Sequence, residues 1–189
     1  MRVSDEMQVL IDPVGAYRRA AAGPLAAGWA VGRPLLISCG LGAATSVMGT
    51  GLITPALFLG GAACWAFVPI IQGLTGLVLV AGAPVVPWRR GLALLFLGHA
   101  PWTLWLLTFA GAMLAGRPLG LLTLMLTAIL PLVATVRTLD AFCREVLHLS
   151  PSVARRRVLV HQAITWTIVL AYADEATQFL PRVIGVFQQ

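Results

Sequence analysis

The chain contains no lysine, and charged residues are scarce along all of its 189 residues. Only 11% of the residues are charged and 59% are hydrophobic, whereas a water-soluble domain has about 25% charged residues. All thirteen basic residues are arginine, which together with abundant Ala, Gly and Leu is typical of a high-GC bacterial genome. The mean hydropathy of +0.89 predicts that the lipid bilayer is the solvent for which this chain is built.

Familiar catalytic and metal-binding motifs are also missing. The sequence has no Walker loop, GxSxG, HExxH, CxxC or CxxCH, and Cys39, Cys64 and Cys143 have no metal-ligand spacing. The pI near 10.6 does not indicate nucleic-acid binding, because the arginines flank apolar segments instead of forming a separate basic face. We therefore expect neither an enzyme nor a nucleic-acid-binding protein.

Long apolar runs predict several membrane-spanning segments. These runs do not alternate between apolar and polar residues, so they indicate helices, whose backbones satisfy their own hydrogen bonds in lipid. Runs of about 20 residues predict spans near 34–50, 55–80, 91–114, 118–136 and 158–180. The predicted fold is an all-α polytopic helical membrane bundle, with about five transmembrane helices plus short interfacial helices.

The second run leaves two interpretations open. Residues 55–87 contain no charge and include four prolines, Pro55, Pro69, Pro84 and Pro87. A single upright helix needs fewer residues than this to cross a bilayer. The run can be one long tilted helix with an extended tail, or one span followed by a re-entrant segment.

The distribution of arginine predicts the topology. With five spans and a cytoplasmic N-terminus, eleven arginines face the cytoplasm, and only Arg117 and Arg182 lie outside. Splitting the second run into two spans would invert this bias for most of the chain. We expect a single membrane domain in the bacterial inner membrane, with the C-terminus in the periplasm.

Two polar segments are predicted to lie at the cytoplasmic surface. Within residues 1–33, Asp12-Pro13 is a helix-start signature and predicts a short helix over 13–22. Four spans then occupy 34–136, and an amphipathic connector over 137–157 precedes the fifth span and C-terminus at 158–189. The connector has helical apolar spacing from Leu139 onward and ends in three basic residues, for which we expect contact with anionic phospholipid or an acidic partner: Arg155, Arg156 and Arg157.

Ionisable residues within predicted spans are candidate functional sites, because they are costly in lipid. His99 lies near a kink expected at Pro101, where it can bond a neighbouring helix or ligate a haem. His161 is expected to be interfacial or a second haem ligand, although its depth differs from that of His99 by about 7 Å. Glu175 falls near the His161 face and could form a proton or ion site with it, or it could be solvated beside Asp174.

Two helix faces are candidates for packing or for partner contact. Ser38, Gly42 and Ser46 form a row of small residues at four-residue spacing, which allows close helix approach in lipid. Trp102 and Trp105 make a bulky face that suits core packing, a lipid tail, a pigment or another subunit.

The organisation resembles the Yip family of five-span membrane proteins, named for Ypt-interacting proteins. Besides the span count, the resemblance is carried by Asp12-Pro13, by Tyr17-Arg18-Arg19, by the REVLHLS sequence over 144–150 and by Ala154-Arg155. It implies a non-catalytic membrane protein with a cytoplasmic N-terminus. The Asp-Leu-Tyr-Gly-Pro type of motif found in eukaryotic members is absent.

The leading functional hypothesis is a non-enzymatic scaffold or accessory subunit of a larger inner-membrane complex. Its expected partners are other membrane subunits, anionic phospholipid and a second copy of the chain, and no cofactor is required beyond bound lipid. The alternative is a membrane-anchor electron-transfer subunit that binds haem b, quinone or pigment, or a small proton- or ion-translocating subunit.

Overall fold

The computed structural model describes residues 3–23, 29–81, 83, 86–117 and 120–187. Helices and the turns between them account for all of these residues, and none of them forms a strand, so the predicted all-α fold is confirmed. The helices are α1 (Val3–Ile11), α2 (Pro13–Ala22), α3 (Trp29–Thr50), α4 (Pro55–Thr75), α5 (Leu77–Val80), α6 (Trp88–Gly98), α7 (Ala100–Leu114), α8 (Leu121–Glu145) and α9 (Pro151–Phe187).

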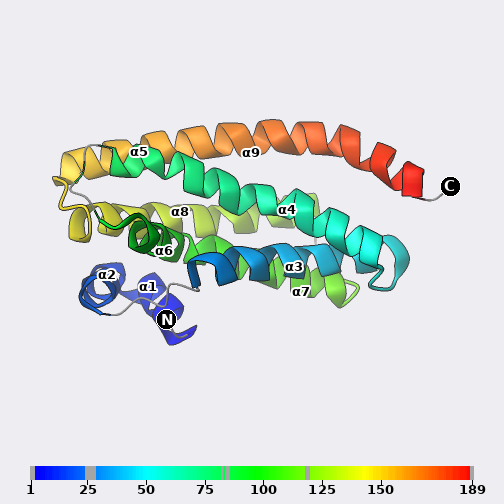
Figure 1. The fold of residues 1–189 in the computed structure, drawn as a ribbon, viewed down its shortest axis with the longest axis horizontal. Helices are drawn as coiled ribbons and strands as arrows, with labels where there is room; N and C mark the ends of the chain where they lie inside the picture. Colours follow the sequence, from blue (N-terminus) through cyan, green and yellow to red (C-terminus); the bar gives the residue numbers. More distant parts are fainter. Residues whose placement is uncertain (1–2, 24–28, 82, 84–85, 118–119, 188–189) are drawn as a thin grey trace.

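Apart from α6, which is seen nearly end-on, the helices that follow α2 run back and forth along one long axis (Figure 1). Helix α3 runs away from the end at which α1 and α2 lie, α4 and α5 return, α7 runs outward again, α8 returns, and α9 runs outward. Helix α8 therefore finishes, and α9 begins, at the same end of the molecule as the N-terminal pair. The far end of α9 lies at the opposite end of the bundle.

Fewer helices than the five predicted are long and apolar enough to cross a membrane by themselves. Among the described residues, Pro55–Val80 and Leu122–Glu145 are long and apolar enough to cross a membrane. The pair α6 and α7, bent by 61°, is a third candidate if its two halves form one span. Helices α3 and α9 are not among these candidates within the described residues.

Most of the second apolar run forms one continuous helical segment. Helix α4 leads into α5 through Gly76, whose φ of −57° and ψ of −23° are helical. The 26 residues from Pro55 to Val80 can cross a bilayer as a unit, as the long-helix interpretation predicts. Residues 82, 84 and 85 of the expected tail lie outside the described part of the chain.

The predicted connector over 137–157 is not a separate surface helix. Its first part continues α8 without a break as far as Glu145, and its last part is the start of α9 at Pro151. Leu139, Phe142 and Cys143 are fully buried in the main hydrophobic core. The expectation that this apolar face lies in the headgroup layer was wrong, because the face packs against other parts of the same chain.

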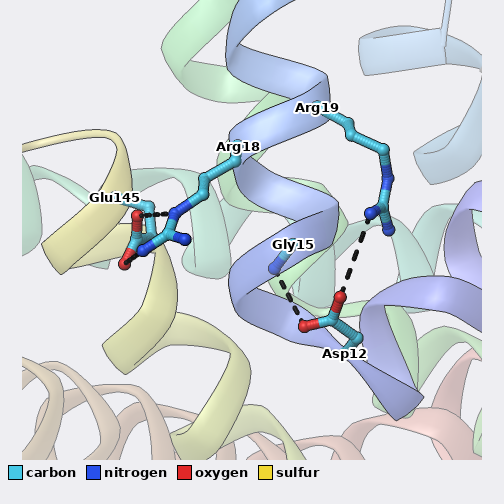
Figure 2. A network of polar contacts seen from close by, with 5 residues as sticks. All are labelled: Asp12, Gly15, Arg18, Arg19 and Glu145. Carbon is cyan, nitrogen blue, oxygen red and sulfur yellow. Dashed lines mark hydrogen bonds and ion pairs between the residues drawn. The ribbon is translucent and has the colours of Figure 1, made fainter.

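Helix α2 confirms the helix predicted over 13–22, and it is anchored to the bundle. Asp12 caps it by accepting a hydrogen bond from the Gly15 amide at 2.9 Å, with Pro13 at the first helical position (Figure 2). Arg18 extends from the helix to Glu145 at the end of α8, with a nitrogen–oxygen distance of 2.7 Å. The preceding helix, α1, was not predicted from the sequence.

Tyr17 provides a buried contact between α2 and the bundle. Its ring has no exposed surface, lies 5.7 Å from the ring of Phe142, and donates its hydroxyl to the Leu94 carbonyl at 3.2 Å. Burial raises the pKa of the Tyr17 phenol above its ordinary value, and the positive charge of Arg33 lowers it to a smaller extent. Helix α2 therefore docks with a neutral phenol.

Candidate functional site

A break between α6 and α7 places His99 inside the bundle. His99 has φ −95° and ψ 10° and separates the two helices, whose axes meet at 61°. Pro101 lies in the first turn of α7, where it has no N–H with which to continue the hydrogen bonds of α6. The Gly98 carbonyl at the break accepts a hydrogen bond from the Thr138 hydroxyl at 2.6 Å. The kink predicted from Pro101 is therefore present, and α8 stabilises it.

The bend brings His99 against His161 of α9. Their Nε2 atoms are 3.4 Å apart, and both residues are at most 2% exposed. The Nδ1 atom of His99 lies 3.0 Å from the Leu95 carbonyl, which can only accept, so this nitrogen carries the proton. In the neutral pair, His161 then donates its Nε2–H to Nε2 of His99. Two residues predicted at different depths thus form one buried hydrogen-bonded pair.

A bis-histidine haem does not fit between these two rings. Iron held by both imidazoles would need their nitrogens about 4 Å apart on opposite faces of a porphyrin, since metal–imidazole bonds are about 2 Å long. Here the nitrogens are 3.4 Å apart and the rings meet edge to face, with an interplanar angle of 75°. Both nitrogens of His99 are already engaged, one by Leu95 and the other by His161.

A cavity of about 550 Å³ opens beside this pair, between α4, α7, α8 and α9. Most of its wall is apolar, and five aromatic side chains form much of it: Trp65, Trp102, Trp105, Phe109 and Trp166. Met125 of α8 and Leu170 of α9 also line the cavity and are 63% and 64% exposed, so the cavity reaches the outer surface of the bundle. A largely apolar hollow of this size with a few polar groups is the usual form of a small-molecule site.

Polar side chains in the cavity wall come from two helices and from the break between α6 and α7. Gln72 of α4, His99 of the kink, and Gln162 and Thr165 of α9 all contribute. The Thr165 hydroxyl is paired with that of Thr75 at 2.7 Å, which ties α9 to α4 at this level. The Gln72 and Gln162 amides supply both N–H donors and C=O acceptors. The wall can therefore hold a flat apolar molecule and bond a polar group at its edge.

The tryptophan face predicted on α7 lines this cavity. Trp102 and Trp105 meet edge to face with centroids 5.6 Å apart, and Trp105 donates its indole N–H to Thr127 of α8 at 3.1 Å. Trp102 also lies 4.9 Å from Trp166 of α9. Sequence reasoning missed Trp65 and Trp166, because they lie on α4 and α9 and join the tryptophans of α7 around one cavity only after folding.

The small-residue row of α3 serves packing within the chain. A Cβ added to Gly42 would lie 2.6 Å from the Phe58 carbonyl oxygen, so α3 and α4 approach too closely there for any larger residue. Ser46 is fully buried, and its hydroxyl accepts a hydrogen bond from the Thr54 amide at 2.7 Å. Ser38 is buried as well. This row is therefore covered by the chain itself and offers no open partner face.

The structure does not bring His161 and Glu175 together. They are fourteen residues apart in one continuous helix, α9, which separates them by about 21 Å. His161 is fully buried, whereas Glu175 is exposed. The side chain of Asp174 lies outside the described part of the structure. The predicted pairing of His161 with Glu175 as a proton site was wrong, because similar angular positions on a helix do not imply similar depth.

The three consecutive arginines of α9 have different environments. Arg155 and Arg156 are exposed, as expected for contacts with lipid or a partner. Arg157 is half-buried and donates from Nη1 to the Leu79 carbonyl at 2.8 Å, where α5 ends near α9. It therefore has a structural role that the sequence did not suggest.

Comparison with known protein families, curated proteins and solved structures finds no match for this chain.

Proposed function

We propose that this protein is a five-span bacterial inner-membrane protein that binds an isoprenoid quinone in the cavity between α4, α7, α8 and α9. The observation that carries the proposal is an aromatic-walled cavity with amide and imidazole groups in its wall. A quinone ring is flat and apolar on both faces, and its carbonyl oxygens accept hydrogen bonds. Stacking on the tryptophans and donation from Gln72 and Gln162 match these two properties.

The opening beside Met125 supports a ligand that enters from lipid. The surface of α8 around this residue is apolar and exposed, with Leu122, Leu126 and Ile129 close by in sequence. A hydrophobic tail can remain on this surface while the ring occupies the cavity. Haem is a poorer match at the same site, because neither nitrogen of His99 is free to ligate iron.

Five spans with a cytoplasmic N-terminus remain part of the proposal. Helices α3 and α9 contain polar residues, but Arg33, His161 and Gln162 are buried and so do not face lipid. Polar groups that face the interior of a bundle are tolerated in spanning helices. The alternating direction of the helices in Figure 1 and the predicted split of eleven cytoplasmic and two external arginines support the same topology.

The protein is proposed to be an accessory subunit with no reaction of its own, supplying bound quinone to a larger complex. A purely structural scaffold has weaker support, because one of its sequence arguments was the Ser38, Gly42 and Ser46 face, and that face is covered within the chain. Membership of the Yip family stays a hypothesis that adds nothing to this assignment.

Tryptophan fluorescence tests the proposal, because four of the six tryptophans line the cavity. Titrating a short-chain ubiquinone analogue into the detergent-solubilised protein should give saturable quenching. Gln72→Leu removes one donor and should weaken binding about two- to tenfold, the value of one hydrogen bond. Thr108→Val is the matched control, since Thr108 is exposed on α7 and bonds only within its own helix.

Two outcomes would contradict quinone binding. Quenching that rises linearly without saturation, equally in the wild type, Gln72→Leu and Thr108→Val, would mean that quinone only partitions into the detergent. A reduced b-type haem band in the purified protein that disappears on His99→Ala would instead favour a haem-binding subunit.

A further inference from the structure

A second hollow of about 690 Å³ runs along the outer side of the bundle between α8 and α9. Arg137, Asp140 and Arg155 lie toward the end where α8 finishes and α9 begins. The deeper part is apolar and includes Val133 and Leu159, which are 59% and 60% exposed. Along α9, the hollow extends from Arg155 to Trp166, a distance of about 16 Å. We call this hollow the α8–α9 groove.

The polar end of the α8–α9 groove carries excess positive charge. Arg137 and Arg155 are both exposed and come from opposite walls. Asp140 is the only acidic residue in the lining, and its Oδ2 atom is paired with Arg144 at 2.8 Å. Its Oδ1 atom is buried and has no hydrogen-bond partner among the described residues. The end therefore offers two cationic donors and one carboxylate acceptor.

We propose that the α8–α9 groove binds one phosphatidylglycerol molecule. The phosphate lies between Arg137 and Arg155, because guanidinium groups match phosphate oxygens in charge and geometry. A hydroxyl of the glycerol headgroup donates to the Asp140 carboxylate, whose side chain is 20% exposed at this end of the groove. One acyl chain follows the apolar floor past Val133 and Leu159 toward the middle of the bundle.

The charge balance favours an anionic lipid over phosphatidylethanolamine. An ammonium group could also reach Asp140, but a zwitterionic headgroup brings no net charge to the two arginines. Each basic residue near an anionic headgroup strengthens binding about fivefold, so two acting together strengthen it roughly thirtyfold. Of the three arginines predicted to contact lipid, only Arg155 lines the groove. Arg156 does not line it, and Arg157 donates to the Leu79 carbonyl.

This lipid site is independent of the proposed quinone site. Arg137 and Arg155 do not line the cavity, whereas Gln162 and Trp166 line both hollows. The test therefore leaves these two shared residues unchanged. Saturable quinone quenching should persist in the variants that lose the lipid, so the two proposals can fail separately.

The test measures lipid bound to the full-length protein. Protein purified from vesicles with equal amounts of phosphatidylglycerol and phosphatidylethanolamine should retain phosphatidylglycerol in about equimolar amount, as counted by native mass spectrometry. Arg137→Gln with Arg155→Gln should reduce this retention about tenfold or more. Arg156→Gln is the matched control, because it removes the same charge one residue away from a groove arginine. It should retain the lipid.

Ala163→Trp provides a second test that changes no charge. Ala163 is exposed and lines the apolar part of the groove, so an indole there should displace the acyl chain and lower lipid retention severalfold. Size-exclusion elution and helical circular dichroism identify any variant that fails to fold. The proposal is wrong if both lipids are retained equally, or if Arg156→Gln loses as much phosphatidylglycerol as the double variant.

Discussion

At the scale of single residues, His99 and His161 each provide the hydrogen-bond partner of the other. Both are buried, and the Nε2–H of one meets the Nε2 of the other at 3.4 Å. Removing one partner leaves a polar atom without a bond in a region where water is scarce. That penalty is usually larger than the net contribution of the bond itself.

A double-mutant cycle measures this coupling. His161→Leu should lower the free energy of unfolding in detergent by about 1–3 kcal/mol, because it leaves Nε2 of His99 without a donor. His99→Leu should have a similar effect. The double variant His99→Leu with His161→Leu should be less destabilised than the sum of the two single variants, since it leaves no orphaned partner.

The third histidine provides the control for this cycle. His148 is exposed and has a φ of 52°, so His148→Asn preserves a backbone conformation that asparagine tolerates. It should leave stability within about 0.5 kcal/mol of the wild type. Strictly additive effects of His99→Leu and His161→Leu would show that the two imidazoles do not interact.

At the scale of secondary-structure elements, three contacts hold α2 to the bundle: buried Tyr17, the ion pair of Arg18 with Glu145, and Arg90 of α6, which donates to the Ala20 and Gly23 carbonyls at the end of α2. Tyr17 is completely buried against Phe142 and Leu94, whereas the side chain of Arg18 is 68% exposed in its ion pair. Exposed ion pairs contribute only about 0.2–1 kcal/mol, while burial of a large aromatic ring contributes several times more. Packing of Tyr17 should therefore contribute more to the docking of α2 than the ion pair does.

Limited proteolysis tests this ranking. Tyr17→Ala should make trypsin cleave after Arg18 or Arg19 many times faster than in the wild type, because α2 must leave the bundle and unwind before it can be cut. Glu145→Gln, which weakens only the ion pair, should change the cleavage rate little and keeps both cleavage sites. If Glu145→Gln accelerates cleavage as much as Tyr17→Ala, the ion pair and not the ring holds α2.

The break between α6 and α7 was predicted from the sequence, but the contact of His99 with His161 was not. Pro101 predicted a kink from local stereochemistry alone, since its ring removes a hydrogen-bond donor. In the folded chain the bend is 61°, and Thr138 of α8 bonds the Gly98 carbonyl at the break. The sequence did not predict that His99 at this break would lie against His161.

At the scale of the whole molecule, we propose an odd number of crossings. The N-terminal pair and the far end of α9 lie at opposite ends of the long axis (Figure 1). If this axis is the membrane normal, eleven of the thirteen arginines belong on the cytoplasmic side. Among the described residues, two helices are long and apolar enough to cross by composition alone, and the bent pair of α6 and α7 is a third candidate. Two crossings would leave both ends on one side, whereas three or five would not.

Reporter fusions distinguish these topologies. Fusions after residues 50, 87, 116, 150 and 189 should report outside, inside, outside, inside and outside in turn, because each predicted loop lies between consecutive crossings. A fusion after residue 22 is the reference and should report inside. External signals at 87 and 150 would require the five-span topology to be abandoned.

The sequence by itself determined the features that depend on local chemistry. Apolar run length located helices α3, α4 and α8 and the continuation of α4 to Val80, and Asp12-Pro13 located α2. These succeeded because hydrogen bonding within a helix, capping by a side chain and the stereochemistry of proline act over a few residues. The tryptophan face of α7 was visible for the same reason, since helical spacing alone creates it.

Only the tertiary structure determined which of these residues contact one another. The sequence placed His99 and His161 at different depths and aligned His161 with Glu175 by angle, whereas the bend at His99 joins the first pair and α9 separates the second by about 21 Å. It left open whether the Ser38, Gly42 and Ser46 row meets a partner, and α4 covers that row. Depth, bend angle and packing partner each depend on contacts among several helices, so no single segment of sequence determines them.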